Sequence, residues 1–286
     1  MDLAFIGAGI MGHGMAVNLL KAGHQVSVIA HKNRLPIDDL VSKGATEALS
    51  YDKLLKGKEA IFLCLTNSLV AESVINDLTP FIEKNCLIID TTTHEPSAPA
   101  LLAEKTASVS ARYVEAPVTG GVKQAAEGVL GAIVACQDQD FEEANDLLLC
   151  FCKQVEHFGP VGMAAKTKLV SNFLALGTAT LVVETFNHAA TLGIDWKKLY
   201  ELAQLGSGNS SAMHRIIGNA LEENFQGYVF TNKNTLKDFG YIKQLFDREG
   251  LDSSLAKTMK SLYEISNKEG DGDLMLSERL KTQRKN

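Results

Sequence analysis

The chain has little of what proteins use to clamp metals or to cross-link themselves. Its 286 residues include only five cysteines, an odd number with no CxxC pair, and its seven histidines show no HxxxH spacing. Zinc sites and thiol-exchange sites normally need such pairs. We therefore expect reduced cysteines buried in the core of a cytoplasmic protein, and no metal site.

Excess positive charge and long apolar runs are also missing. The 28 basic and 34 acidic side chains leave a net charge of -6, which would repel a nucleic-acid backbone. No window approaches the roughly 18 uninterrupted apolar residues of a membrane span. The N-terminus enters the strand-like DLAFIG directly, without the basic region of a secretory signal. We expect no nucleic-acid partner and no membrane partner.

Short apolar, β-branched runs alternate with amphipathic segments in the first half of the chain. Six runs have strand length, at residues 3–7, 25–30, 60–65, 86–91, 113–118 and 130–136. Strands separated by helices pair in parallel through right-handed crossovers. This pattern predicts a doubly wound, mostly parallel α/β sheet.

The pattern changes at about residue 162, where strand candidates end and long segments of helical period follow. Three residues mark the join: Gly159, Pro160 and Gly162. No proline occurs between 163 and 192, so this stretch can form one helix of about 30 residues and ~45 Å, ended by Gly193. We predict a first domain at 1–161, an all-helical domain at 162–286, and a long interdomain helix at about 163–192.

A glycine-rich loop follows the first predicted strand. Gly7, Gly9 and Gly12 fit GxGxxG, with Ile10 and Met11 before the third glycine. The loop opens a helix, and a second strand begins soon after, so the βαβ unit takes about 30 residues, as the dinucleotide fingerprint requires. A pyrophosphate would lie against free N–H groups at the helix N-terminus. The sequence therefore predicts a Rossmann-type, NAD(P)-binding first domain.

Basic residues, rather than an acid, follow the second predicted strand. NAD-specific sites usually place a carboxylate there, but this chain has His31, Lys32 and Arg34, with no carboxylate before Asp38. Such a cluster would attract the 2′-phosphate of NADP, and a guanidinium would bind it through two hydrogen bonds. We expect NADP to be favoured over NAD. If the cluster is only a solvated turn, the choice of cofactor stays open.

Five segments in order, including this loop, carry a resemblance to a known family. They are FIGAGIMGHGMAVNLL at 5–20, DTTTHEP at 90–96, EAPVTGG at 115–121, GMAAKTKLVSN at 162–172 and LKD at 236–238. Together they resemble the signatures of the β-hydroxyacid dehydrogenases, the group of 3-hydroxyisobutyrate dehydrogenase, tartronate semialdehyde reductase and glyoxylate/succinic semialdehyde reductase. Four residues depart from these signatures. Thr92 and Thr119 stand where the family usually has serine, Ala164 stands where it has a glycine, and Ser171 stands where it has an asparagine. Because of these four departures, the resemblance does not determine the substrate range or the catalytic rate.

The resemblance implies reversible hydride transfer between NADP(H) and a short hydroxy acid or its semialdehyde or keto acid. It implies Lys168 as the general acid/base, with Asn172 beside it, and no metal. Only Lys168 stands four residues before Asn172, on the same helical face, whereas Lys166 is rotated roughly 200° away. Burial, or a neighbouring cation such as Lys237, should lower the pKa of Lys168 toward neutrality.

Further residues are implied to bind substrate and cofactor. The backbone of Thr119, Gly120 and Gly121 is implied to receive a substrate carboxylate, and Lys123 to add positive charge. The residues implied to line the cofactor are Leu65, Thr66, Thr93 and Lys237. This part of the chain looks nearest to the glyoxylate/succinic semialdehyde reductase branch, which prefers NADPH.

Other readings of the sequence remain. Imine reductases share the expected architecture but lack a lysine at the position of Lys168, and a non-catalytic NADP-binding module would have no reason to keep the motifs together. The resemblance implies a homodimer or homotetramer formed through the helical domain, which would also bind substrate. The sequence does not fix the physiological substrate.

Overall fold

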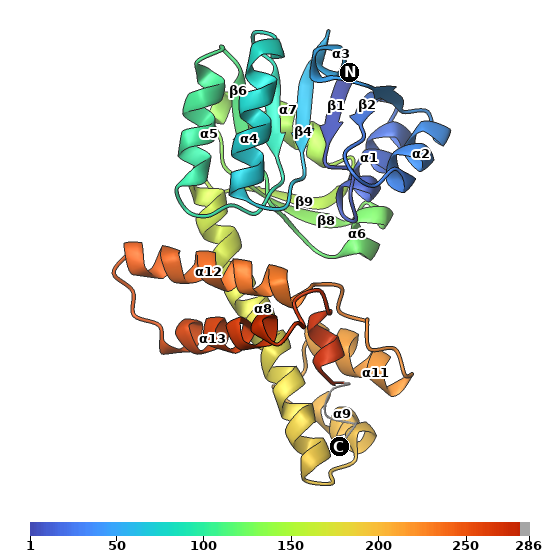
Figure 1. Ribbon diagram of the computed structural model, residues 1–286, viewed down its shortest axis with the longest axis vertical. Helices are drawn as coiled ribbons and strands as arrows, with labels where there is room; N and C mark the ends of the chain where they lie inside the picture. The colour runs from blue at the N-terminus through green and yellow to red at the C-terminus, as the bar shows by residue number, and fades with distance from the viewer. Residues whose placement is uncertain (281–286) are drawn as a thin grey trace. The chain divides into compact units, whose positions relative to one another are not determined.

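The structure is a computed structural model that describes residues 1–280. The chain divides into two compact units, residues 1–168 and residues 169–286. The division falls inside helix α8 (Met163–Thr191), so this helix gives its first turns to one unit and its remainder to the other (Figure 1). The predicted domain boundary after residue 161 stays a prediction.

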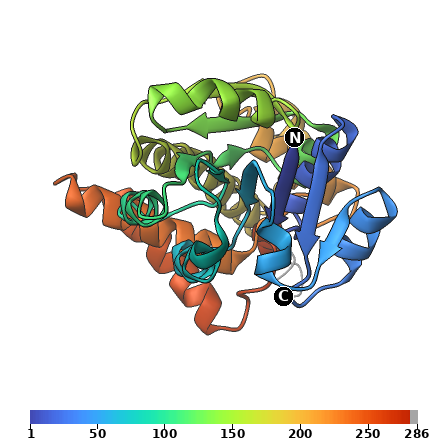
Figure 2. The same ribbon diagram turned by 90° about the horizontal axis from the view of Figure 1, so that it is seen from above.

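Six parallel strands form the sheet of the first unit, in the order β3-β2-β1-β4-β5-β6 (Figures 1 and 2). They are β1 (Asp2–Ile6), β2 (Gln25–Ile29), β3 (Thr46–Ala48), β4 (Ala60–Leu63), β5 (Leu87–Asp90) and β6 (Arg112–Glu115). The order reverses between β1 and β4, and open α/β sheets bind ligands beyond the carboxyl ends of the strands at such a reversal. The predicted doubly wound α/β sheet is confirmed.

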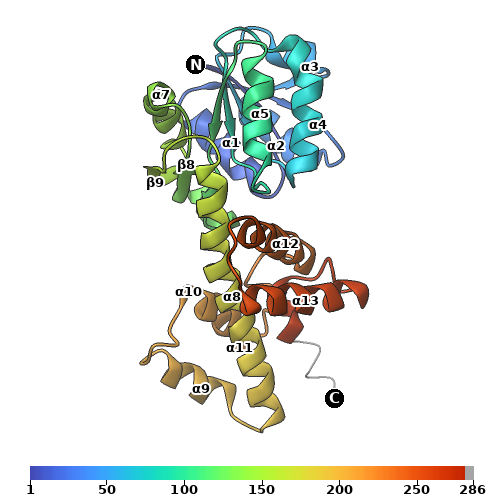
Figure 3. The same cartoon turned by 90° about the vertical axis from the view of Figure 1, so that its left-hand side faces the viewer.

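Helices cover both faces of this sheet because successive strand residues point to opposite sides. Leu3 and Phe5 of β1 pack with α1, α2 and α7, whereas Ala4 and Ile6 pack with α3, α4 and α5. Figure 3 shows α4 and α5 on one side and α7 on the other. The helices are α1 (Gly12–Lys21), α2 (Leu35–Ser42), α3 (Tyr51–Leu55), α4 (Ser68–Leu78), η1 (Thr79–Phe81), α5 (Ala98–Ala107), α6 (Val122–Glu127) and α7 (Asp138–Leu148).

A second, three-stranded sheet departs from the prediction. Its strands are β7 (Val118–Thr119), β8 (Leu130–Val134) and β9 (Cys152–His157), in the order β7-β8-β9. The run at 113–118, expected to be one strand, is divided between β6 and β7 around Pro117, which has no N–H for a ladder. Strand β9 was not predicted, because its residues CKQVEH are largely polar and lack the apolar pattern of a buried strand; half of them are exposed.

The second unit is helical, as predicted. Its elements after α8 are α9 (Trp196–Ala203), α10 (Ser211–Met213), the π-helical turn η2 (His214–Gly218), α11 (Asn219–Leu221), α12 (Asn232–Arg248), α13 (Ser254–Lys268) and η3 (Leu276–Leu280). Helices α12 and α13 pack side by side (Figure 3). The rings of Phe239 and Tyr263 stack between them with centroids 5.8 Å apart. Up to residue 280 this unit has no strand, only an isolated bridge between Thr231 and Met275.

Helix α8 confirms the long helix expected at 163–192. It ends at Thr191, and Gly193 follows with a left-handed φ of 70°. By length and composition alone α8 could cross a membrane, and 44% of its most apolar window is buried inside the protein. Its buried side chains, such as Val183 and Phe186, belong to the core of the second unit.

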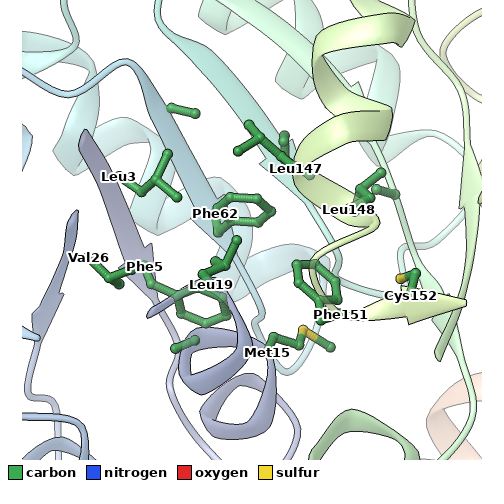
Figure 4. Close-up of a cluster of buried hydrophobic side chains, with 14 of the residues drawn as sticks. Leu3, Phe5, Met15, Leu19, Val26, Phe62, Leu147, Leu148, Phe151 and Cys152 are labelled. Atoms are coloured by element: carbon green, nitrogen blue, oxygen red, sulfur yellow. The ribbon is translucent and has the colours of Figure 1, made fainter. Parts of the chain in front are cut away.

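Three aromatic rings lie at the centre of the first unit's core (Figure 4). Phe5 and Phe62 stack at 5.8 Å between centroids, and Phe151 meets Phe62 edge-on at 5.8 Å. All three are fully buried, and such ring pairs add to the free energy gained by burial. Phe62 contacts both neighbours, so it joins the sheet to the segment that leads into β9.

We expect Phe62→Ala to lower the free energy of unfolding by about 3–5 kcal/mol, because it leaves a cavity at this centre. Urea denaturation followed by circular dichroism would measure the change. The control Phe81→Ala alters a side chain that is 43% exposed and should stay within about 0.5 kcal/mol of the wild type. Equal effects of the two substitutions would contradict the packing described here.

Candidate functional site

The glycine loop between β1 and α1 is shaped for close approach by a ligand. A Cβ added to Gly7 or to Gly12 would lie 2.2 Å from a backbone oxygen, and Gly7 has a φ of 95°. By contrast, a Cβ on Gly9 would meet no atom within 4 Å. Ile10 is exposed, Met11 is partly exposed, and no side chain caps α1. The loop therefore fits a pyrophosphate bound at the helix N-terminus.

Arg34, the residue that precedes α2, is already paired in this structure. Its guanidinium donates to both carboxylate oxygens of Glu47, at 2.9 and 3.0 Å, and to Asp38 at 2.9 Å. These hydrogen bonds raise the pKa of Arg34, and the same pairing lowers the pKa of Glu47. His31 and Lys32 lie exposed beside it. The sequence reading missed Glu47 because it did not include β3, the strand that holds this acid.

The loops after β4 and β5 meet at the same carboxyl edge of the sheet. The Leu65 N–H donates to Oγ1 of Thr92 at 3.0 Å. Thr66 is exposed and Thr93 is partly buried. The structure thus brings together two segments that the sequence assigned to one cofactor pocket.

A buried polar network lies beneath these loops. Oδ2 of Asp90 is 2.8 Å from Nε2 of His94 and accepts a hydrogen bond from the Tyr113 hydroxyl at 3.1 Å. Oδ1 of Asp90 accepts from the Thr92 N–H at 2.9 Å, and Ser68 lies 3.3 Å from the other ring nitrogen of His94. Burial acts to raise the pKa of Asp90, but His94 and the hydrogen bonds outweigh it, so that pKa is lowered. His94 is buried, and the sequence predicted no role for it.

Glu115, the last residue of β6, is fully buried and engages the start of α8. One carboxylate oxygen accepts the Ala165 N–H at 3.0 Å, and the other accepts the Gly162 N–H. Burial raises the pKa of Glu115 to about 7, although the two hydrogen bonds act to lower it. Lys168 follows on the next turn of α8 and is itself buried.

The segment implied to bind a carboxylate is partly occupied by its own side chains. Thr119 and Gly120 are exposed, and Gly120 has a φ of 120°. The Gly121 N–H donates to the side-chain oxygen of Gln124 at 3.0 Å. Lys123 is exposed and pairs with an acid on the same short helix, α6. An incoming carboxylate would have to displace the Gln124 amide from Gly121.

In the second unit, Asn172 is held by an acid that the sequence reading did not single out. Its side-chain nitrogen donates to Oδ2 of Asp238 at 2.7 Å, and Nζ of Lys237 lies 3.1 Å from Oδ1 of the same carboxylate. Lys237 also lies 5.3 Å from the ring centre of Tyr241. The only signal for Asp238 was its place beside Lys237 in the LKD segment. The carboxylate fixes which way the Asn172 amide faces.

The five cysteines are free thiols; Cys86, Cys136 and Cys152 are buried as expected, whereas Cys64 and Cys150 are partly exposed. Within residues 1–280, no group of three or more His, Cys, Asp or Glu side chains is arranged to hold a metal ion.

Comparison with known proteins follows the same division of the chain. Residues 2–159 match the NAD binding domain of 6-phosphogluconate dehydrogenase, and residues 162–282 match the NAD-binding domain of NADP-dependent 3-hydroxyisobutyrate dehydrogenase.

Among whole proteins, glyoxylate/succinic semialdehyde reductase 1 of Arabidopsis thaliana is 27% identical over 97% of this chain and 96% of its own length. Mitochondrial 3-hydroxyisobutyrate dehydrogenase of Drosophila melanogaster is 29% identical over 72% of this chain and 64% of its own length. A 3-hydroxyisobutyrate dehydrogenase structure from Salmonella typhimurium, 20% identical, superposes with a TM-score of 0.90 over 99% of both chains, which shows the shared fold. Since the family models span nearly the whole sequence, the chain belongs to the β-hydroxyacid dehydrogenase family.

Proposed function

We propose that this protein is an NADP(H)-dependent oxidoreductase that interconverts a short 3-hydroxy acid, or a 2- or 4-hydroxy acid, with its semialdehyde or keto acid. The observation that carries the proposal is the position of Lys168. This lysine is buried on α8, whose first turn is hydrogen-bonded to the carboxyl end of β6. The glycine loop lies at the carboxyl end of β1 in the same parallel sheet.

The residues divide the chemical work as follows. The loop from Gly7 to Gly12 binds the cofactor pyrophosphate, and the bound nicotinamide supplies or accepts the hydride. Lys168 donates a proton to the substrate carbonyl oxygen during reduction, and it accepts the hydroxyl proton during oxidation. Asn172, oriented by Asp238, hydrogen-bonds the substrate. The cofactor loop and Lys168 belong to the first unit, and Asn172 follows Lys168 by four residues on the same helix.

The remaining assignments extend this scheme. Leu65, Thr66 and Thr93 line the nicotinamide, and Lys237 reaches the cofactor. The backbone from Thr119 to Gly121, aided by Lys123, receives the substrate carboxylate once the Gln124 side chain has moved away. We place the domain boundary after residue 161, because one family model matches residues 2–159 and the other matches residues 162–282.

NADP preference rests on His31, Lys32 and Arg34, and the structure adds a competitor for the last of these. The Glu47 carboxylate occupies the two guanidinium N–H groups that a 2′-phosphate would use. We therefore propose that NADPH is preferred and that Glu47 moderates this preference.

Lys168→Ala should lower kcat by about 10²–10⁴-fold, because the proton donor is lost, while the Kd for NADPH changes less than about threefold. The assay is NADPH oxidation with glyoxylate, succinic semialdehyde, tartronate semialdehyde or methylmalonate semialdehyde. Lys166→Ala removes a lysine two residues away on another face of α8 and serves as the matched control. If both variants keep the wild-type rate, or both lose it equally, Lys168 is not the acid/base.

Glu47→Gln should tighten NADPH binding about two- to fivefold, the range expected when an exposed ion pair no longer competes, and leave NADH binding unchanged. Arg34→Gln should weaken NADPH binding by about tenfold or more, since a charge-assisted contact is lost. In the double variant with both substitutions, Glu47→Gln should no longer tighten NADPH binding. Fluorescence titration measures each Kd, with Lys43→Gln as the control for a nearby exposed cation. Independent, additive effects of the two substitutions would contradict competition.

We also propose a homodimer or homotetramer. Val170, Leu174 and Leu181 lie on one face of α8 and are 53%, 73% and 61% exposed, which is unusual for three aliphatic side chains on one helix. Sedimentation at micromolar concentration should give at least twice the chain mass of 30.9 kDa, and Leu174→Glu should reduce it. A wild-type species at the chain mass would refute this assembly.

A further inference from the structure

Glu115 is a buried acid to which the proposed reaction gives no role. It ends β6, has no exposed surface, and directs both carboxylate oxygens at backbone N–H groups of the segment that starts α8. Gly162 precedes the helix, and Ala165 lies in its first turn. The clamp therefore joins the carboxyl edge of the sheet to the helix that carries Lys168.

The ionised form of Glu115 does not serve the stability of the fold. Its pKa is raised from an ordinary value of 4.5 to about 7, so the folded state resists its ionisation. The stability linked to this group is complete below about pH 4.5 and is lost as the pH rises through about 7. A neutral glutamine of the same shape would avoid this cost.

Ionisation of Glu115 instead strengthens its hydrogen bonds to the start of α8. A carboxylate has two acceptor oxygens, and both are used here by N–H groups that lack partners inside the helix. Negative charge at a helix N-terminus is also favourable. Lys168 comes three residues after Ala165, nearly one helical turn, so whatever fixes the Ala165 backbone also fixes where the lysine side chain begins.

Other titratable groups face Glu115 from the neighbouring strands. The charge of Asp90, at the end of β5, acts to raise the pKa of Glu115, and His94 acts to lower it. Tyr113, two residues earlier on β6, feels both acids and has its pKa raised, chiefly by burial. The ionisation of Glu115 is thus tied to the Asp90–His94 network as well as to α8.

We propose that ionised Glu115 is a positioning residue, which clamps the first turn of α8 and so places Lys168 at the carboxyl edge of the sheet, and that protonation releases this turn. The inference rests on the proposed role of Lys168.

The first test compares kcat and KM from pH 5.5 to 9 for the wild type, Glu115→Gln and Glu115→Asp. An amide offers one acceptor oxygen and turns an NH₂ group toward the second backbone N–H. In Glu115→Gln we expect kcat to fall roughly 10- to 100-fold through misplacement of the lysine, with KM changed less than about threefold.

The wild-type kcat should decline below about pH 7, and Glu115→Gln should lack this decline. Glu115→Asp, which keeps the charge, should retain it. Glu156→Gln, on the exposed strand β9, is the matched control.

The second test measures the hydrogen bonds of Glu115 to the start of α8 directly and needs no substrate turnover. Hydrogen exchange at the Gly162 and Ala165 amides, corrected for the intrinsic effect of pH, should show protection that is lost in the wild type below about pH 7 and is low at every pH in Glu115→Gln. If no substrate is turned over but this protection is seen, the clamp stands and the proposed function fails. Wild-type kcat together with unchanged protection in Glu115→Gln would overturn the inference. If that variant does not fold, the wild-type exchange profile and Glu115→Asp decide, and pH-independent wild-type protection refutes the clamp.

Discussion

Backbone N–H groups at the start of a helix must find an acceptor, and two helix starts at one sheet edge govern this structure. Helix α1 begins after a glycine loop that keeps side chains away, so its N–H groups can receive a cofactor phosphate. Helix α8 begins against Glu115, whose carboxylate supplies the acceptors from within the protein. The N-terminus of α1 is open to a ligand, whereas N–H groups at the start of α8 are already bound by Glu115. The first would receive the proposed cofactor, and the second fixes the helical turn that precedes Lys168.

The same competition between internal and external anions recurs at the end of β2. Arg34 has the geometry to bind a phosphate, yet Glu47 already satisfies two of its N–H groups. The basic cluster is therefore less available to bind an anion than the sequence indicates, because Asp38 and Glu47 offset part of its charge. The proposed preference for NADPH would therefore depend on how well a 2′-phosphate competes with these two carboxylates for Arg34.

The sequence was sufficient wherever structure depends on local pattern. The glycine loop, the parallel strands and the long helix at 163–192 follow from spacing and periodicity, and all three are confirmed. It was insufficient where partners meet only through folding. Glu47 reaches Arg34 because β3 pairs with β2, and His94 reaches Tyr113 through Asp90 because β5 pairs with β6. Strands β3 and β7, of three and two residues, are too short to leave a readable pattern.

In the reaction that we propose, a hydride would pass directly from the nicotinamide to the substrate carbonyl carbon, and Lys168 would supply the proton. The most direct measurement uses NADPH deuterated at C4, in each of its two configurations, with the semialdehyde panel and mass spectrometry of the product. Direct transfer predicts that one configuration gives a product with one deuterium on the new carbinol carbon, and that Lys168→Ala forms this product at least about 100-fold more slowly. Reduced product without deuterium from either configuration, or NADPH binding with no product across the panel, would contradict it.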